Sequence, residues 1–359
     1  MESTNNTLDG IREARIQKLT DLIDKGINPY PYSYDRNISA AELQKRYENL
    51  PAGEETEDSY SVAGRVMAMR NTGMFIDLMD SSGKIQIFSH KENLSEDKLA
   101  VLKLLDVGDI VGFSGTIRRT PRGELSIKAL DLKLLSKALR PLPEKFHGLV
   151  DVDTRYRKRY LDLVVNQEVR DTFRKRSLII QKIREYLTKD GFLEVETPML
   201  QTQAGGASAR PFETFHNALS MPMYMRIAPE LHLKRLLVGG LSEKIFELNR
   251  NFRNEGIDIR HNPEFTMLEL YQAYVDYNDM MVLLENMVAS VAMDVLGTTK
   301  ITFQGKELDL TPPWDRKTML GAIKEFTGVD FSEKLTVEEA AAEAKKMGIE
   351  VEESDSWGK

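Results

Sequence analysis

The chain has 359 residues, 41% of them hydrophobic, and its 49 Lys and Arg against 56 Asp and Glu give a formal net charge of −7. This length suffices for two hydrophobic cores, and the negative balance argues against a sequence-blind nucleic-acid binder, which would need many basic residues to neutralise phosphates. The absence of cysteine excludes disulfides, cysteine-ligated metal and thiol catalysis. No apolar run approaches the roughly 18 residues of a membrane helix, so we expect a soluble, cytoplasmic protein without membrane contact.

The first part of the chain predicts two helices. Apolar residues recur at helical spacing over Leu8–Lys25, and a second, shorter helix is expected over Ala40–Asn49 with Ser39 as its N-cap. The acidic stretch Pro51–Ser59 is typical of a linker. We therefore expect an N-terminal helical extension with its linker over residues 1–57.

Short runs of alternating polarity, separated by Gly, Asn and Ser, follow over Tyr60–Leu135. About five strands, interrupted by a helix over Glu96–Leu105, predict a small closed barrel of the OB type. A barrel without a ligand is the plainer interpretation. The early strands, however, carry Arg70, Phe75 and Gln86, and an aromatic ring beside hydrogen-bonding side chains suits splayed single-stranded bases.

The next region predicts mixed structure. An amphipathic helix is expected over Val169–Lys189 and a strand over Phe192–Val195. The adjacent glycines of Gly205–Phe212 allow close approach of backbone to a ligand, or simply form a flexible loop tip. A strand then leads into a helix with Pro229 in its first turn, where Glu230 is most simply a favourable charge at a helix N-terminus.

The stretch Phe246–Tyr274 predicts an antiparallel hairpin around the turn Gly256–Pro263. At period two, one face carries polar and aromatic side chains, namely Asn249, Asn251, Arg253, Glu255, Phe265, Met267, Glu269 and Tyr271. The other face carries the apolar side chains Phe246, Leu248, Phe252, Leu268 and Leu270. A surface hairpin with solvated charges is the alternative, but carboxylates, arginine and aromatic residues in phase favour a binding surface.

Beyond the hairpin we expect a helix from Val275 to about Leu296, a β-like run over Ile301–Leu310 and a helix over Thr336–Gly348.

Several segments resemble a known family. The sequences FRNE, RHNPEF and ELYQAY are similar to motif 2 of class II lysyl-tRNA synthetases. GFLEVETPML is similar to motif 1, which forms the dimer interface in that family, and internal packing is the equal alternative for this segment. The barrel segment, with its GRV and TPRGELSI, resembles the family's anticodon-binding domain, and RYRKRYLDL resembles the start of its catalytic domain. The resemblance implies an α+β protein with an OB-fold barrel over residues 58–145 and a class II catalytic domain, an antiparallel sheet with flanking helices, over residues 146–359.

The resemblance further implies ATP-dependent attachment of L-lysine to tRNA(Lys) through a lysyl-adenylate, by a homodimer. Because ATP and the amino-acid carboxylate are both anionic, Arg253 is expected to be the catalytic residue that bridges them. The expected ATP-binding residues are Arg253, Glu255, His261, Asn262 and Phe265, although an exposed loop histidine remains the alternative for His261. The expected lysine-binding residues are Gly206, Glu230, Arg253, Glu269 and Tyr271, and the expected anticodon-binding residues are Arg70, Phe75, Gln86 and Glu124.

The sequence lacks the family's glycine-rich motif 3 and its magnesium-binding glutamates. We therefore expect Mg²⁺ to be required but to find no ligand within this chain, and we expect the chain alone to activate lysine weakly or not at all. A catalytically silent RNA-binding and dimerising protein is the main alternative. An aspartyl- or asparaginyl-tRNA synthetase is disfavoured by the APELHLKR and ELYQAY segments.

Overall fold

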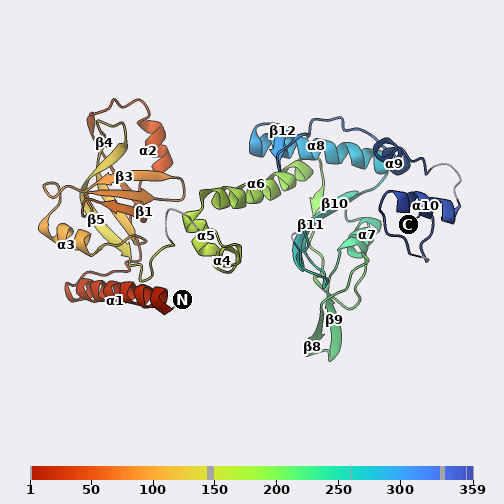
Figure 1. Cartoon of the computed structure of the whole chain (residues 1–359), viewed down its shortest axis with the longest axis horizontal. Helices are drawn as coiled ribbons and strands as arrows, with labels where there is room; N and C mark the ends of the chain where they lie inside the picture. Colours follow the sequence, from red (N-terminus) through yellow and green to blue (C-terminus); the bar gives the residue numbers. More distant parts are fainter. Residues whose placement is uncertain (1, 144–148, 259, 332–335, 353, 359) are drawn as a thin grey trace. The chain divides into compact units, whose positions relative to one another are not determined.

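The computed structural model describes residues 2–143, 149–258, 260–331, 336–352 and 354–358. Contacts within the chain divide it into two compact units, Met1–Val169 and Arg170–Lys359 (Figure 1). The domain boundary predicted between residues 145 and 146 lies outside the described residues. Among the described helices, none combines the length and apolar character that a membrane span requires.

The first unit contains a closed barrel in which the strands follow the order β1-β2-β3-β5-β4 and β4 pairs again with β1. Side chains at alternate positions fill its interior, and Ile76, Ile87, Phe113 and Ile127 are fully buried there. The predicted OB-type barrel is therefore confirmed. The strands are β1 Glu55–Arg70, β2 Phe75–Met79, β3 Lys84–Phe88, β4 Ile110–Arg119 and β5 Leu125–Ser136.

The predicted linker Pro51–Ser59 is wrong in its second half, because β1 begins at Glu55. Glu55 is the register partner of Arg118 on β4, and its carboxylate also lies 2.9 Å from the Lys128 ammonium. The backbone of Arg119 exchanges hydrogen bonds with Gly53 and Glu54 just before the strand. Cross-strand ion pairs thus hold an acidic segment in the sheet, and they depend on residues distant in the sequence.

The helices of the first unit are α1 Glu2–Asp24, α2 Ala40–Arg46, α3 Glu96–Leu104, α4 Val152–Arg157 and α5 Arg159–Val165. Ser39 caps α2 as predicted, in a capping box with Glu42. The Arg15 side chain fixes α1 to the barrel by donating hydrogen bonds of 3.0 Å to the Val107 carbonyl and 2.9 Å to the Arg140 carbonyl. The helical extension therefore packs on the barrel rather than standing apart from it.

The second unit is built on the predicted hairpin, in a sheet of order β11-β10-β6. Phe246 and Leu248 on one hairpin face pack against Leu187 of α6 and against Met287 and Val291 of α8 (Figure 1). The remaining strands form a sheet of order β7-β9-β8 and the hairpin β12-β13. The strands are β6 Leu193–Glu194, β7 Leu200–Gln201, β8 Glu213–His216, β9 Met221–Met225, β10 Lys244–Phe252, β11 Glu264–Gln272, β12 Lys300–Phe303 and β13 Lys306–Asp309.

The helices of this region are α6 Gln167–Lys189, which begins at the end of the first unit, α7 Glu230–Val238, α8 Tyr277–Leu296, α9 Met319–Thr327 and α10 Val337–Lys346. The helices, the strand after α6 and the β-like run that the sequence predicts in this region are confirmed within a few residues.

Arginine side chains continue the hydrogen bonding along one edge of β10. Strand β6 pairs with β10 at Ile245 and Phe246. Further along the same strand, Arg184 donates to the Leu248 carbonyl (3.2 Å) and Arg226 donates to the Arg250 carbonyl (2.9 Å). Leaving a buried carbonyl without a hydrogen-bond partner destabilises the protein. These guanidinium groups therefore supply the hydrogen bonds that a longer neighbouring strand would otherwise make.

We expect Phe246→Ala to lower the free energy of unfolding of the second unit by about 3–5 kcal/mol, because it leaves a cavity in the core between the hairpin and its helices. Urea unfolding followed by circular dichroism measures this change. Phe303→Ala, at an exposed position of β12, is the matched control and should have little effect. Equal stability of the two variants would contradict the assignment of this core.

Candidate functional site

The hairpin register brings the predicted polar residues together. Across β10 and β11 the partners are Glu247 with Glu269 and Asn251 with Phe265, and Met267 lies opposite Asn249. Their phase is opposite to that of the core-facing Phe246 and Leu248, so the prediction of one apolar and one polar face is confirmed.

The extent of the first strand is a correction. Strand β10 ends at Phe252, so Arg253 and Glu255 are not strand residues as predicted. Arg253 stays close to the hairpin because its backbone N–H donates to the Pro263 carbonyl (2.9 Å). Glu255 lies in the turn and is exposed. The chain leaves the ladder there because the backbone of Asn254 donates instead to the Arg210 carbonyl (2.7 Å).

Four of the five residues predicted to bind the amino acid, Gly206, Glu230, Glu269 and Tyr271, lie together at the junction of α7 and β11, whereas the side chain of Arg253 lies against Phe265. The Tyr271 hydroxyl donates to a Glu269 carboxylate oxygen at 3.2 Å. Glu230, the first residue of α7, lies on the other side of the cluster and adds to the negative potential at Glu269. Gly206, with a φ of +86°, packs so closely on Glu230 that a β-carbon added at position 206 would lie 2.9 Å from the Glu230 β-carbon. A side chain at position 206 would therefore displace Glu230.

Burial raises the pKa of Glu269; the Tyr271 hydroxyl lowers it, whereas the nearby Glu230 and Glu247 carboxylates raise it further. The pKa of Tyr271 is also raised, first by burial and then by the carboxylates of Glu269 and Glu230. Tyr271 therefore keeps its proton as a hydrogen-bond donor. A cluster in which negative charge is already costly is well suited to receive a cation.

A buried ion pair involving the neighbouring strand of the hairpin lies next to this cluster. Arg226 is fully buried, and its guanidinium lies 2.7 Å from the carboxylate of Glu247, which is 1% exposed. The same guanidinium donates to the Thr197 hydroxyl (3.0 Å), and that hydroxyl donates to Glu247 (2.7 Å). Glu247 is the register partner of Glu269, so Arg226 also reduces the repulsion between two carboxylates on one face.

Arg253 and Phe265 are adjacent, with the guanidinium carbon 5.2 Å from the centre of the ring. This arrangement holds the arginine by a cation–π contact and positions its planar fork. Within the described part of the chain, the Arg253 Nε atom, the Arg226 Nη2 atom and both amide atoms of Asn251 are buried without a hydrogen-bond partner. A buried polar atom without a hydrogen-bond partner costs free energy, so these atoms on the polar face of the hairpin are available to bind water or a ligand.

The turn residues lie at the surface. His261 and Asn262 are exposed, like Glu255. The Asp258 carboxylate accepts hydrogen bonds from the backbone of Arg260 and His261 and lies 2.7 Å from the His261 ring. The structure thus places Arg253 and Phe265 together and leaves the other predicted nucleotide contacts on a separate, exposed turn.

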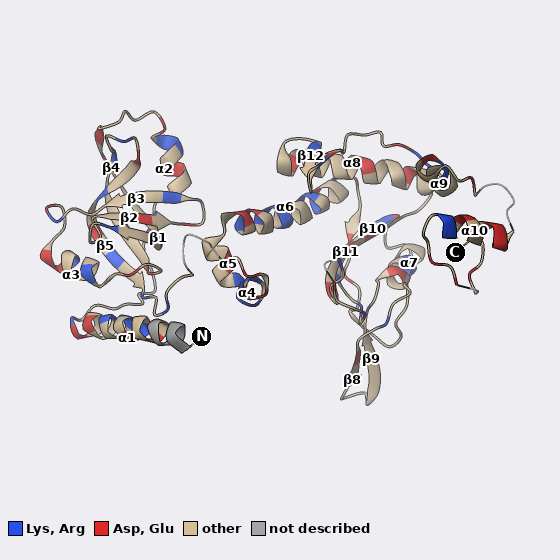
Figure 2. Cartoon of the chain, in the orientation of Figure 1, with Lys and Arg blue, Asp and Glu red and all other residues tan. Residues whose placement is uncertain are grey.

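On the barrel, the four predicted anticodon-binding residues share the outer surface. Register pairs Arg70 with Phe75 and places Gln86 beside Ser126, opposite in phase to the buried isoleucines. The Ser126 hydroxyl donates to the Gln86 side-chain oxygen (2.8 Å), and Glu124 lies 3.8 Å from the Lys84 ammonium. Figure 2 shows acidic and basic residues interspersed around this barrel rather than segregated.

Sequence reasoning missed several neighbours of these residues. Asp77 holds Arg70 through hydrogen bonds of 2.8 and 3.2 Å. The ring of Phe88 lies 5.4 Å from that of Phe75 and 5.8 Å from that of His90, with Arg118 over its face at 4.5 Å. Phe88 lies two positions after Gln86, so strand alternation could have predicted that it shares the outer surface. No local pattern indicates that Arg118 lies over the Phe88 ring. The surface is therefore a row of rings rather than a single ring.

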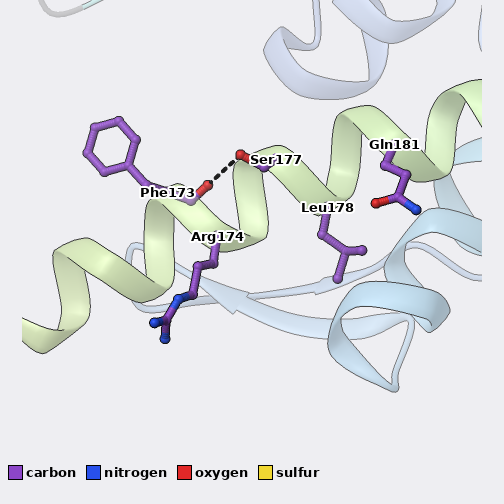
Figure 3. A pocket seen from close by; sticks show the side chains of 5 residues that line it. All are labelled: Phe173, Arg174, Ser177, Leu178 and Gln181. Atoms are coloured by element: carbon purple, nitrogen blue, oxygen red, sulfur yellow. Dashed lines mark hydrogen bonds between the residues drawn. The ribbon is translucent and has the colours of Figure 1, made fainter. Parts of the chain in front are cut away.

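A shallow hollow of about 400 Å³ lies along α6, lined by Phe173, Arg174, Ser177, Leu178 and Gln181 (Figure 3). Helix α6 packs on the apolar face of the hairpin, so this hollow is separate from the polar face. Among the described residues no cluster of three or more His, Asp or Glu side chains has the geometry to hold a metal ion.

In the second unit, sequence reasoning missed Glu247, Arg226 and Lys234. Glu247 shares the period-two phase of Asn249 and Asn251, which was a usable signal. Lys234 follows Glu230 by four positions on α7, which was also a usable signal, whereas no local pattern indicates that Arg226 reaches the cluster.

Comparison with known proteins gives consistent results for both units. Residues 151–354 match the family of class II tRNA synthetases (D, K and N), and residues 60–135 match the OB-fold nucleic acid binding domain. The lysine–tRNA ligases of Rhizobium leguminosarum bv. trifolii and Sinorhizobium medicae are each 50% identical, over 99% and 96% of this chain and 72% and 70% of their own lengths. That of Nostoc sp. PCC 7120 is 52% identical over 98% of this chain and 64% of its own length.

We expect Glu247→Gln to lower the free energy of unfolding by about 3–5 kcal/mol, because it leaves the buried Arg226 charge without its carboxylate. Chemical denaturation measures the loss. Glu243→Gln, an exposed position just before the same strand, is the control and should change stability little. A Glu247→Gln protein as stable as the control would show that the pair does not support the hairpin.

Proposed function

The chain belongs to the class II tRNA synthetases of the aspartate, lysine and asparagine group, and from that premise we propose that it is a lysine–tRNA ligase. The reaction joins L-lysine to ATP as a lysyl-adenylate and transfers the lysyl group to the terminal ribose of tRNA(Lys). Because motif 3 is absent from the sequence, this chain by itself is proposed to carry out the activation step weakly or not at all. The observation that carries the choice of lysine is the cluster of Glu230, Glu269 and Tyr271.

The cluster accounts for amino-acid selection on physical grounds. A lysine ammonium leaving water needs negative partners, because an unpaired buried charge costs several kcal/mol. Glu230 and Glu269 supply carboxylates, and the protonated Tyr271 orients one of them. Aspartate or asparagine would bring a carboxylate or a neutral amide to the same place, where repulsion or an unmet charge would oppose binding. The close packing of Gly206 on Glu230 keeps Glu230 in position.

For the activation step we propose that Arg253 is the catalytic residue. A lysine carboxylate oxygen attacks the α-phosphorus of ATP, a P–O bond forms, and the bond to the departing pyrophosphate breaks. Both reactants are anionic, so a guanidinium held in place reduces their repulsion and stabilises the charge in the transition state. The contact with Phe265 holds Arg253, and the ring itself is proposed to stack on the adenine. No base is required, because the carboxylate is already ionised.

We assign the remaining nucleotide contacts to the turn, with Glu255, His261 and Asn262 on the purine amino group and phosphates. Mg²⁺ is proposed to accompany ATP, as is general for this kind of chemistry. The described residues do not provide a metal-binding cluster of three or more His, Asp or Glu side chains.

The barrel is proposed to bind the anticodon of tRNA(Lys). Bases of a splayed loop stack on aromatic side chains and are recognised through their edges. Phe75 would stack on the central base, and Arg70, Gln86 and Glu124 would contact base edges. The support is their shared outer surface and the second ring of Phe88.

We further propose a cytoplasmic homodimer whose barrel and catalytic domains meet near residue 145, the dimer forming through α6 and the strand that follows it; the predicted limit at residue 57 moves toward the N-terminus, because β1 begins at Glu55. Phe173, which lines the hollow of Figure 3, and Ile179 are exposed apolar residues of α6. A catalytically silent RNA-binding protein is less well supported, because such a protein has no use for the assembled acidic cluster.

We expect Glu269→Gln to weaken lysine binding by at least about tenfold, because a hydrogen bond to a charged group contributes about 1.5–3 kcal/mol. Isothermal titration calorimetry of the full chain with L-lysine measures the Kd. Glu264→Gln, on the opposite face of the same strand, is the matched control and should bind lysine like the wild type. Wild-type affinity in Glu269→Gln would contradict the proposed substrate.

We expect Phe75→Ala to weaken binding of the tRNA(Lys) anticodon stem-loop about 5- to 100-fold, since one base–aromatic stack contributes about 1–3 kcal/mol. Fluorescence anisotropy at fixed salt measures the Kd. Phe303→Ala removes an exposed phenylalanine from the second unit and should leave the affinity unchanged. The barrel surface would lose its proposed role if both variants bound the stem-loop equally.

A further inference from the structure

The acidic cluster already contains a primary ammonium that belongs to the chain itself. The Lys234 Nζ atom lies 2.5 Å from a Glu230 carboxylate oxygen, one helical turn away on α7. A Glu and a Lys at this spacing are common on helix surfaces, where the pair contributes little. The position of this pair at the amino-acid cluster gives it a further consequence.

The same ammonium reaches the strand side of the cluster. Lys234 Nζ lies 5.8 Å from the centre of the Tyr271 ring, within the range of a cation–π contact. The hydroxyl of that ring donates to Glu269. Lys234 therefore contacts two of the residues proposed to recognise lysine, one from the helix and one from the strand.

The chemical identity of Lys234 matters because its side chain is that of the proposed substrate. A four-carbon stem ending in an ammonium satisfies Glu230 in the same way that an amine of a bound lysine would. Like-charged carboxylates at Glu230, Glu269 and Glu247 repel one another, and burial already raises the pKa of Glu269. Arg226 pairs with Glu247, whereas Lys234 pairs with Glu230.

The ion pair between Lys234 and Glu230 can separate at low cost. The Lys234 side chain is 52% exposed and that of Glu230 is 31% exposed, so water can replace either partner at low cost. The fully buried Arg226, in contrast, has no such freedom. A ligand ammonium that also reached Glu269 and Tyr271 would gain more contacts with the cluster than Lys234 makes.

We propose that Lys234 is an internal counter-ion of the amino-acid site, which neutralises Glu230 when no amino acid is bound and must be displaced when lysine binds. Lys234 is then a specificity-determining residue, because a ligand too weakly cationic to compete for Glu230 does not displace it. The apparent affinity for lysine is reduced by the fraction of protein in which Glu230 is already paired. This inference rests on the proposed function.

The test is calorimetric titration of L-lysine into the full chain, in wild type, Lys234→Met, Lys234→Arg and Arg235→Met. Lys234→Met keeps the length of the side chain and removes its charge, so we expect about two- to fivefold tighter lysine binding, the range set by the modest strength of a half-exposed pair. Lys234→Arg restores a competing cation and should return the Kd toward the wild-type value. Arg235→Met removes the neighbouring, exposed charge on the same helix and should leave the Kd unchanged.

Ionic strength supplies a second readout that a purely structural role would not move. The gain in Lys234→Met over wild type should shrink as salt rises, because salt weakens the competing pair. An unchanged or weaker Kd in Lys234→Met, with wild-type binding intact, would overturn the counter-ion role alone. Failure of the wild type to bind lysine would instead overturn the proposed function and, with it, this inference.

Discussion

Two carboxylates, Glu247 and Glu269, lie directly opposite each other on one face of the β10–β11 hairpin, and the buried guanidinium of Arg226 makes this arrangement tolerable. Like charges at opposed positions of a sheet normally destabilise it. By pairing with Glu247 and Thr197, Arg226 leaves Glu269 free to face the cluster with Glu230 and Tyr271. Arg226 also donates a hydrogen bond to the Arg250 carbonyl at the edge of β10. One side chain therefore stabilises both the sheet and the carboxylates on its polar face.

The hairpin separates folding from chemistry by face. Phe246 and Leu248 provide the packing against α6 and α8, so the opposite face is free to carry groups that would be unfavourable in a core. The buried amide of Asn251 shows the cost of that freedom, since its hydrogen-bonding capacity is unmet within the described protein. Sites with such unmet capacity are poised to bind polar ligands.

The barrel follows the same division with a different geometry. Its interior is filled by alternate aliphatic side chains, so the outward positions of β1, β2, β3 and β5 are available for recognition. Asp77 fixes Arg70, and Phe88 extends the stacking surface beside Phe75. Local alternation predicts which strand residues face outward and so pointed to Arg70, Phe75 and Gln86, whereas Glu124, which precedes β5, came from resemblance to a family.

Periodicity predicted the helices, the barrel and the two faces of the hairpin, because each of these depends on residues two to four positions apart. It also placed Glu269 and Tyr271 in one phase, and Glu230 and Gly206 came from resemblance to a family. Contacts between distant segments had no such signal: the start of β1 at Glu55 depends on Arg118, and the departure of Arg253 from the strand depends on Arg210.

The sequence therefore determines which charged groups are present, but the fold determines which distant groups they pair with. Arg226 lies 21 residues from Glu247 and 29 from Thr197, and Lys234 lies beside Tyr271 because α7 packs against β11. The ion pair between Arg226 and Glu247 forms because two distant segments meet in space, and no local spacing specifies that meeting, unlike the i,i+4 pair of Glu230 and Lys234. Helical spacing thus brings Lys234 to Glu230, but the tertiary structure alone decides that Glu247 is paired with Arg226, that Glu269 is left for a ligand and that the Glu230–Lys234 pair lies beside Tyr271.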